Sequence, residues 1–267
     1  MKKTKFPELA EHIKQNKAAF AVYAILRLLV ILVLIRCIFI GKWESVFVCT
    51  LTLILFLIPP FVEKKFSIKL PTALEITVYI FVFCAEILGE ISSFYVIYPI
   101  WDTLLHTTSG FIFAAFGFCL LDLLNRNKKV NFTPLTLTLM AFCFSMTIGV
   151  MWEFFEFFAD RFMSLDMQKD VIVNSIFSVT FDESLQNQAV PITDILKTTL
   201  TLADGSTFVF DGYLDIGIID TMKDLFVNFI GAVVFCTCGY FYIVHRGGRA
   251  RKLVESFIPT VQKDEKE

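Results

Sequence analysis

Charged residues are scarce in this sequence, since only 19% of its 267 residues are Asp, Glu, Lys or Arg. An ordinary soluble domain carries about 25% charged residues, which keep its surface hydrated. At the same time 56% of the residues are hydrophobic, and 31 of them are Phe. This composition excludes a disordered chain, a disulfide-rich secreted module and an ordinary cytosolic enzyme.

Positive charge is not in excess either, because 24 Lys and Arg stand against 26 Asp and Glu. Proteins that bind nucleic acid carry a basic face, so no nucleic-acid partner is expected. All seven cysteines fall inside apolar stretches, which argues against a disulfide framework. The sequence also lacks an internal repeat, a P-loop, an HExxH motif and a nucleophile elbow.

Long apolar stretches are present instead. A helix needs about 20 largely apolar residues to cross the hydrocarbon core of a bilayer. Six stretches meet this requirement, near 18–40, 44–62, 73–98, 100–124, 134–160 and 217–244. We therefore expect an all-α fold, a polytopic bundle of six transmembrane helices that forms a single integral membrane domain over 1–267, surrounded by membrane lipid.

The stretch 161–216 is too long to be a simple connector between two spans. Within it, Thr199–Phe210 consists of two alternating runs on either side of Asp204-Gly205. Alternation around Asp-Gly is typical of a β-hairpin. The sequence therefore predicts a loop insert with a small β element.

Lys and Arg alternate between the loops, and this pattern predicts the orientation in the membrane. They gather in the N-terminal segment, around 64–69, around 126–129 and at 246–252, whereas the first and third loops are poor in them. The loop 161–216 carries three basic residues against eight acidic ones. We expect both termini in the cytosol and this loop outside.

Ionisable residues recur within the spans at helical spacing. Asp102 and His106 are four residues apart, Glu153 and Glu156 three apart, and Asp220 and Asp224 four apart. Each pair thus lies on one face of its helix. Such residues are costly in a bilayer, by about 3 kcal/mol each on insertion scales, and tend to mark function.

The depth of these residues indicates a common site. At 1.5 Å per residue, His106, Glu153 and Asp224 each lie roughly 10 Å inside the outer boundary, although their helices alternate in direction. Arg36, in the first span, is shallower. We therefore expect the motifs to converge on one outward-facing polar pocket.

Several carboxylates in a low dielectric either share protons or bind a cation. Oxygen ligands suit Mg²⁺, Mn²⁺ or Ca²⁺, and a histidine would allow Mn²⁺ or Zn²⁺. The candidate metal ligands are Asp102, His106, Glu153, Glu156, Asp220 and Asp224. The candidate catalytic residues are His106, Glu153 and Glu156, while Arg36 and Lys223 are candidates for holding an anionic substrate. The alternative for Asp102 and Asp220 is that they are simply solvated at helix ends.

The motifs also resemble a known family. Three of them occur in order, namely Asp102-x-x-x-His106-x-x-x-Gly110, Glu153-x-x-Glu156, and Asp220-Thr221-x-x-Asp224 followed by Gly231-Ala232. They resemble the YjdF-type inner-membrane proteins of bacteria over about the last two thirds of the chain, and more distantly the VanZ-like membrane proteins. The long loop 161–216 departs from that pattern. The resemblance implies a bacterial inner-membrane protein but supplies no reaction.

Three functions remain open. The first is a metal-dependent enzyme that acts on a lipid or isoprenoid-phosphate headgroup at the outer surface. The second is a cation- or proton-coupled transporter that uses the same carboxylates as a relay. The third is a non-catalytic membrane partner whose outer loop binds another protein or Ca²⁺. The inner halves of the last three spans are apolar, which disfavours a continuous polar path.

Overall fold

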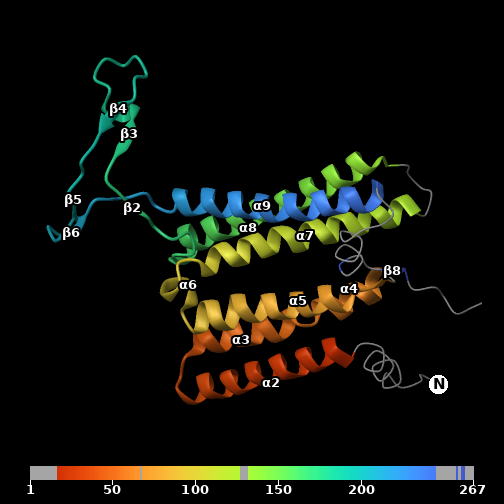
Figure 1. Ribbon diagram of the computed structural model, residues 1–267. Helices are drawn as coiled ribbons and strands as arrows, with labels where there is room; N and C mark the ends of the chain where they lie inside the picture. The colour runs from red at the N-terminus through yellow and green to blue at the C-terminus, as the bar shows by residue number, and fades with distance from the viewer. Residues whose placement is uncertain (1–16, 67, 127–131, 245–256, 258–259, 262–267) are drawn as a thin grey trace, which may run out of the picture. The chain divides into compact units, whose positions relative to one another are not determined.

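The computed structural model describes residues 17–66, 68–126, 132–244, 257 and 260–261, and over these residues the chain is mostly helical (Figure 1). Among them, six helical stretches are long and apolar enough to cross a membrane. The predicted polytopic helical fold is confirmed. Most of the basic flanks on which the orientation depends, at 2–14, 128–129 and 246–252, lie outside the described residues.

The chain divides into two compact parts. The first comprises Met1–Gly149 together with Phe226–Glu267, and the second comprises Val150–Leu225.

The first two spans of the first part are formed by α2 (Lys17–Phe39) and by α3 (Trp43–Leu55) with α4 (Ile58–Phe66). The interruption between α3 and α4 precedes Pro59 and Pro60. A proline has no N–H to continue the helical ladder, and it disfavours the helical conformation of the preceding residue, but it is tolerated in a first turn. The proline pair therefore explains why one helix ends and another begins here.

The third span begins as α5 (Thr72–Phe83) and continues as a π-helix, η1 (Cys84–Ile91). It ends earlier than the apolar stretch 73–98 suggests. Ser93 adopts a left-handed conformation with φ 59°, and a separate short helix, α6 (Phe94–Ile97), follows. A residue with positive φ cannot continue a right-handed helix, so the chain turns at this point.

Helices α2, α3 and α5 lie side by side (Figure 1) and share one apolar core. Its fully buried members include Val30 of α2 and Cys49 of α3, and Tyr79 of α5 packs against them. The short strand β1 (Ile68–Lys69), which follows α4, pairs antiparallel with β8 (Thr260–Val261) near the C-terminus.

The last three spans are α7 (Trp101–Arg126), α8 (Pro134–Met163) and α9 (Ile218–Val244). In the first part of the chain they share a second core, which contains Phe118 of α7, Leu137 of α8 and Phe235 of α9. Ser145 of α8 also donates a buried hydrogen bond of 2.8 Å to the backbone oxygen of Gly110. These three helices are the ones that carry the candidate site residues.

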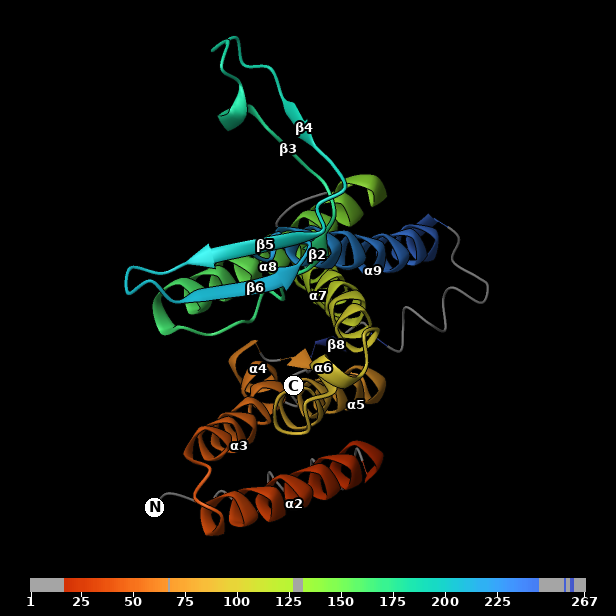
Figure 2. The same ribbon diagram turned by 90° about the vertical axis from the view of Figure 1, so that its left-hand side faces the viewer.

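The second part contains three antiparallel strand pairs. β2 (Ile172–Val173) pairs with β7 (Tyr213–Leu214), β3 (Ile176–Ser178) with β4 (Val190–Ile192), and β5 (Lys197–Thr201) with β6 (Thr207–Asp211). A 3-10 helix, η2 (Val179–Phe181), follows β3. The β5–β6 pair, drawn as two long arrows in Figure 2, confirms the predicted hairpin, and its turn holds Gly205 at φ 84°.

Candidate functional site

The side chain of Asn228 lies where α7, α8 and α9 come together. It is 1% exposed, and its Oδ1 accepts a hydrogen bond of 3.3 Å from the Ser109 hydroxyl. Two glycines make room for it: a Cβ on Gly110 would overlap the backbone of Asn228, and a Cβ on Gly149 would stand 2.7 Å from its Nδ2. Close approach of three helices at one level requires residues without a side chain.

One candidate residue of each of the three motifs lies one helical turn from this layer. His106 precedes Gly110 by four residues, Glu153 follows Gly149 by four, and Asp224 precedes Asn228 by four. Because α7, α8 and α9 are unbroken helices over these residues, each of the three stands one turn, about 6 Å, from the Asn228 layer. This arrangement agrees with the common depth that the helix rise predicts.

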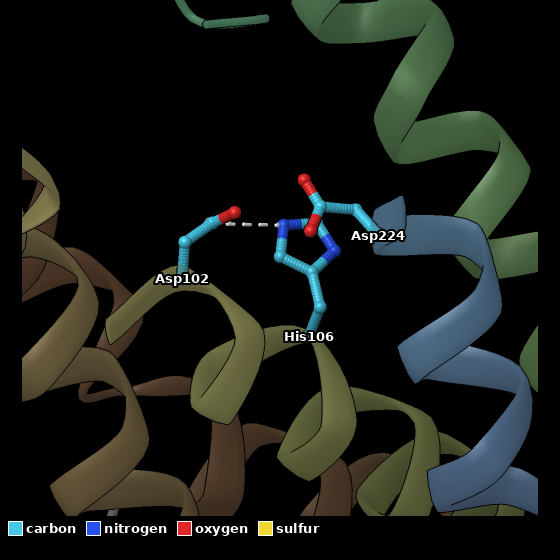
Figure 3. Close-up of side chains that lie close together, drawn as sticks. All are labelled: Asp102, His106 and Asp224. Carbon is cyan, nitrogen blue, oxygen red and sulfur yellow. Dashed lines mark ion pairs between the residues drawn. The ribbon is translucent and has the colours of Figure 1, made fainter. Parts of the chain in front are cut away.

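A cluster of possible metal ligands is formed by Asp102 and His106 of α7 and Asp224 of α9 (Figure 3). One ligand atom from each residue can be chosen so that all three lie within 4.8 Å of one another. The imidazole Nε2 of His106 is 3.4 Å from Oδ1 of Asp102. Asp224 is buried, while the side chains of His106 and Asp102 are 12% and 22% exposed. We refer to these three residues as the Asp/His cluster.

Lys223 supplies a positive charge next to one member of the cluster. Its Nζ lies 3.6 Å from Oδ1 of Asp224 and 3.2 Å from Oδ1 of Asp220. The side chain of Lys223 is 40% exposed, whereas that of Asp224 is 2% exposed. The amine therefore reaches a buried carboxylate from a more open position, where an anion could also approach it.

The two glutamates of α8 are both buried, Glu153 at 5% and Glu156 at 8% exposure. The indole Nε1 of Trp152 donates a hydrogen bond of 2.9 Å to Oε1 of Glu156. Buried carboxylates need such donors, because an isolated charge in a low dielectric is costly. Neither glutamate is among the three residues of the Asp/His cluster.

Asp220 has a structural partner in the loop that follows α8. Its Oδ2 accepts a hydrogen bond of 3.0 Å from the backbone N–H of Lys169. Asp160 accepts from the N–H groups of Met167 and Gln168, and Asp215 accepts from that of Val171. Three carboxylates thus hold the segment 167–171 against the ends of α8 and α9 within the second part of the chain.

Hydrogen bonding changes the acidity of Asp215. Burial raises the pKa of this carboxyl, but backbone N–H groups of Val171, Ile219 and Gly217 donate to it, and the net effect lowers the pKa. Asp170 behaves oppositely: burial, and then the negative charges of neighbouring carboxylates including Asp166 and Asp215, raise its pKa. Negative charge is therefore concentrated in this loop.

Arg36 lies in the last turn of α2, where its side chain is exposed. α2 packs against α3 and α5 rather than contributing to the core of α7, α8 and α9. Of the two candidate anion-binding residues, Lys223 is the one that directly neighbours the Asp/His cluster.

Some polar contacts at this level had no signal in the sequence. Trp152 is a donor to Glu156, and the Nδ2 of Asn228 contacts the sulfur of Met146 at 3.5 Å. The sequence did indicate Asn228, because its i, i+4 spacing from Asp224 places both residues on one face of α9. The contacts of Gly110 and Gly149 with Asn228 could be identified only once the neighbouring helices were known.

The family described as "Predicted membrane protein (DUF2238)" matches residues 22–245, which include five of the six spans whole and the first from residue 22 onward. No curated protein and no solved structure matches the chain.

Proposed function

Because the chain belongs to the DUF2238 family of predicted membrane proteins, we propose that it is a multi-pass membrane protein that binds a divalent cation at Asp102, His106 and Asp224. The observation that carries this proposal is the proximity of three ligand atoms within 4.8 Å. Ligands bound to one cation at 2.0–2.6 Å are separated by at most about 5 Å. The spacing of the cluster fits that limit.

The donor set narrows the choice of cation. Two carboxylates favour hard ions such as Mg²⁺, Mn²⁺ or Ca²⁺, and an imidazole favours Mn²⁺ or Zn²⁺ over Mg²⁺ and Ca²⁺. Mn²⁺ and Zn²⁺ therefore satisfy both kinds of donor. Three protein ligands leave coordination positions for water and substrate, as in catalytic rather than structural metal sites.

The reaction that we propose is hydrolysis of a phosphoester in the headgroup of a membrane lipid or isoprenoid phosphate. A bound divalent ion would polarise a phosphoryl oxygen and lower the pKa of a bound water. The water oxygen forms the new bond to phosphorus as the bond to the leaving oxygen breaks. Because His106 would ligate the ion, Glu153 and Glu156 are the candidates for taking the proton from the water and passing it to the leaving oxygen. Lys223, whose amine lies 3.6 Å from Oδ1 of Asp224, is the candidate for holding the phosphate.

The proposed site faces the outer surface of the membrane. Both termini lie in the cytosol, and 161–216 is an extracytoplasmic insert in a single integral membrane domain. The order of the three motifs supports kinship with the YjdF-type proteins, and with it a location in the bacterial inner membrane. The loop 161–216 carries eight acidic and only three basic residues, and loops poor in Lys and Arg are the ones that cross to the outer side of the membrane.

Metal analysis of the purified protein tests the proposal. We expect stoichiometric Mn²⁺ or Zn²⁺ in the unaltered protein and its loss in His106→Ala and Asp102→Asn. Asp166→Asn is the matched control, because Asp166 is an exposed loop carboxylate beside Lys169. The control should keep its metal.

Thermal unfolding in detergent gives a second measurement that does not depend on retaining the ion through purification. EDTA should lower the unfolding temperature, and Mn²⁺ or Zn²⁺ should restore it, because a ligand that binds only the folded state stabilises it. Inorganic phosphate should add a further shift only when the metal is present. If neither metal content nor unfolding temperature responds in the unaltered protein, the metal site is refuted.

A further inference from the structure

Lys223 lies between two buried carboxylates of its own helix, α9. Its Nζ donates a hydrogen bond of 3.2 Å to Oδ1 of Asp220 and lies 3.6 Å from Oδ1 of Asp224. Asp220 is 8% exposed and Asp224 is 2% exposed. An ionised carboxylate is costly to bury unless a positive charge or a hydrogen-bond donor accompanies it. The ammonium of Lys223 is therefore a counter-ion for both carboxylates.

Of these two carboxylates, Asp224 belongs to the Asp/His cluster and Asp220 does not. Asp224 offers an oxygen within 4.8 Å of ligand atoms of Asp102 and His106, and its carboxylate lies beside the imidazole in Figure 3. Asp220 instead accepts a hydrogen bond of 3.0 Å at Oδ2 from the backbone N–H of Lys169. Asp220 is thus held in place independently of the cluster, as a fixed partner for the ammonium.

A divalent ion in the Asp/His cluster would compete with the ammonium of Lys223 for Asp224. An ion bound to Oδ1 of Asp224 at about 2.0–2.6 Å would lie at most about 6 Å from Nζ. Positive charges at this separation repel each other, and the repulsion is strong where little water screens it. The side chain of Lys223 is 40% exposed and has a flexible stem, so its ammonium can withdraw from Asp224 and keep its bond to Asp220.

The ammonium competes best against ions of its own charge. Because Lys223 directly precedes Asp224 in the chain, its ammonium loses little freedom of movement when it stays at that carboxylate. A free Na⁺ or K⁺ carries the same single charge but would have to be immobilised to replace it. A divalent ion has twice the charge, which doubles its attraction to a carboxylate at a given distance, and Mn²⁺ or Zn²⁺ gains the imidazole as well.

We propose that Lys223 determines the ion specificity of the Asp/His cluster: its ammonium neutralises Asp224 when no metal is bound, and it gives way to a divalent ion but not to Na⁺ or K⁺. This inference rests on the proposed function and describes how the same site is controlled. It also assigns a role to Asp220, which retains the displaced ammonium instead of ligating the metal.

Titration with Mn²⁺ tests the competition. The full chain in detergent is titrated with Mn²⁺, and electron paramagnetic resonance of the free aqueous ion gives the dissociation constant. Lys223→Met removes the ammonium but keeps an unbranched apolar side chain. We expect this variant to bind Mn²⁺ about tenfold more tightly than the unaltered protein, a difference of about 1.4 kcal/mol. Removal of an ion pair that only stabilises the helix would not raise the affinity for a metal.

Two further variants separate the ammonium at Asp224 from charge in general. Lys169→Met makes the same change at an exposed side chain beside Asp166, and it keeps the backbone N–H that donates to Asp220. Lys223→Arg keeps the positive charge. Both variants should bind Mn²⁺ as the unaltered protein does. If either binds it as tightly as Lys223→Met, overall charge or altered packing is responsible and the inference is wrong.

Competition with monovalent ions tests the specificity. Sodium or potassium chloride replaces tetramethylammonium chloride at constant ionic strength, so that only the monovalent cation changes. The affinity of the unaltered protein for Mn²⁺ should stay the same, whereas Na⁺ should weaken the binding of Mn²⁺ to Lys223→Met severalfold. Competition by Na⁺ in the unaltered protein would overturn the inference, and this measurement does not require the variant to fold.

Failure of the metal site is distinguishable from failure of this inference. If the unaltered protein and Lys223→Met both fail to bind Mn²⁺ and Zn²⁺, the Asp/His cluster is not a metal site and both proposals are refuted. If both proteins bind Mn²⁺ with the same affinity, the metal site stands and the role of Lys223 alone is refuted.

Discussion

Gly149 and Asn228 fit against each other, with the Nδ2 of Asn228 only 2.7 Å from the point that a Cβ on Gly149 would occupy. The contact joins α8 to α9 one turn from Glu153 and Asp224. The geometry of the candidate site therefore depends on the packing of Gly149, which has no side chain, against the buried amide of Asn228.

Gly149→Ala should destabilise the protein by about 1–3 kcal/mol, because an extra methyl group in a closely packed interface forces the neighbours to move. Thermal unfolding in detergent measures the loss. Thr147→Ala, on the exposed side of α8, is the control and should have little effect.

The double variant distinguishes this contact from a general loss of helix packing. If the new methyl group clashes with Asn228, Gly149→Ala should lower the free energy of unfolding less in an Asn228→Ala background than in the unaltered protein. The difference between the two losses is the coupling energy of the pair. Strictly additive losses would mean that the two residues do not act on each other.

The six helices were predictable because a bilayer imposes a simple rule on sequence. Every backbone polar group in hydrocarbon must be bonded within its own segment, so spans are long, apolar and helical. The β5–β6 hairpin was predictable for a local reason, since Asp204-Gly205 matches the backbone that a tight turn requires. In contrast, the π-helix η1 and the strands β2, β3, β4 and β7 have no comparable local pattern.

The candidate site was predictable only in part. Helix rise predicts a common depth for His106, Glu153 and Asp224, and two of these, His106 and Asp224, belong with Asp102 to the Asp/His cluster. Rotation about each helix axis and the path of a loop depend on tertiary packing. The hydrogen bond from Lys169 to Asp220 and the one from Trp152 to Glu156 therefore could not be foreseen.

Gly205→Val should unfold the β5–β6 turn, because Gly205 has φ 84° and a β-branched residue is strained there. Trypsin cleavage after Lys197, at the start of β5, should become faster than in the unaltered protein. Ser206→Ala removes a hydroxyl that donates to Asp204 but keeps the glycine, so it should have a smaller effect. Equal cleavage rates for both variants would contradict the role assigned to the glycine.

Asp215→Asn should loosen the loop in a manner that depends on pH. The pKa of Asp215 is lowered in the folded protein, so its carboxylate stabilises the fold above the ordinary Asp pKa of about 3.9. That contribution disappears as the pH falls through the lowered value, where both states are protonated. Hydrogen exchange at Val171 and Ile219, corrected for intrinsic rates, should be faster in the variant at neutral pH and similar in both proteins in strong acid.

The control for this prediction is Asp166→Asn, because the side chain of Asp166 is exposed and its Oδ2 lies 3.8 Å from Nζ of Lys169. An exposed ion pair contributes little to stability. A loss of protection at neutral pH as large as that of Asp215→Asn would show that loop charge in general, rather than the backbone hydrogen bonds to Asp215, is responsible.

The orientation of the protein can be tested with reporter fusions, and we expect a reporter after Lys197 to be active only outside and one after Lys252 only inside. The expectation rests on the excess of Lys and Arg in alternate loops, since basic loops are retained in the cytosol. One membrane span, α9, lies between Lys197 and Lys252. The two fusion points must therefore lie on opposite sides of the membrane and give opposite results. A fusion after Lys42, between the first two spans, is the control and should behave like the one after Lys197. The reversed pattern would place the Asp/His cluster toward the cytosol, and a headgroup substrate would then have to come from the inner leaflet.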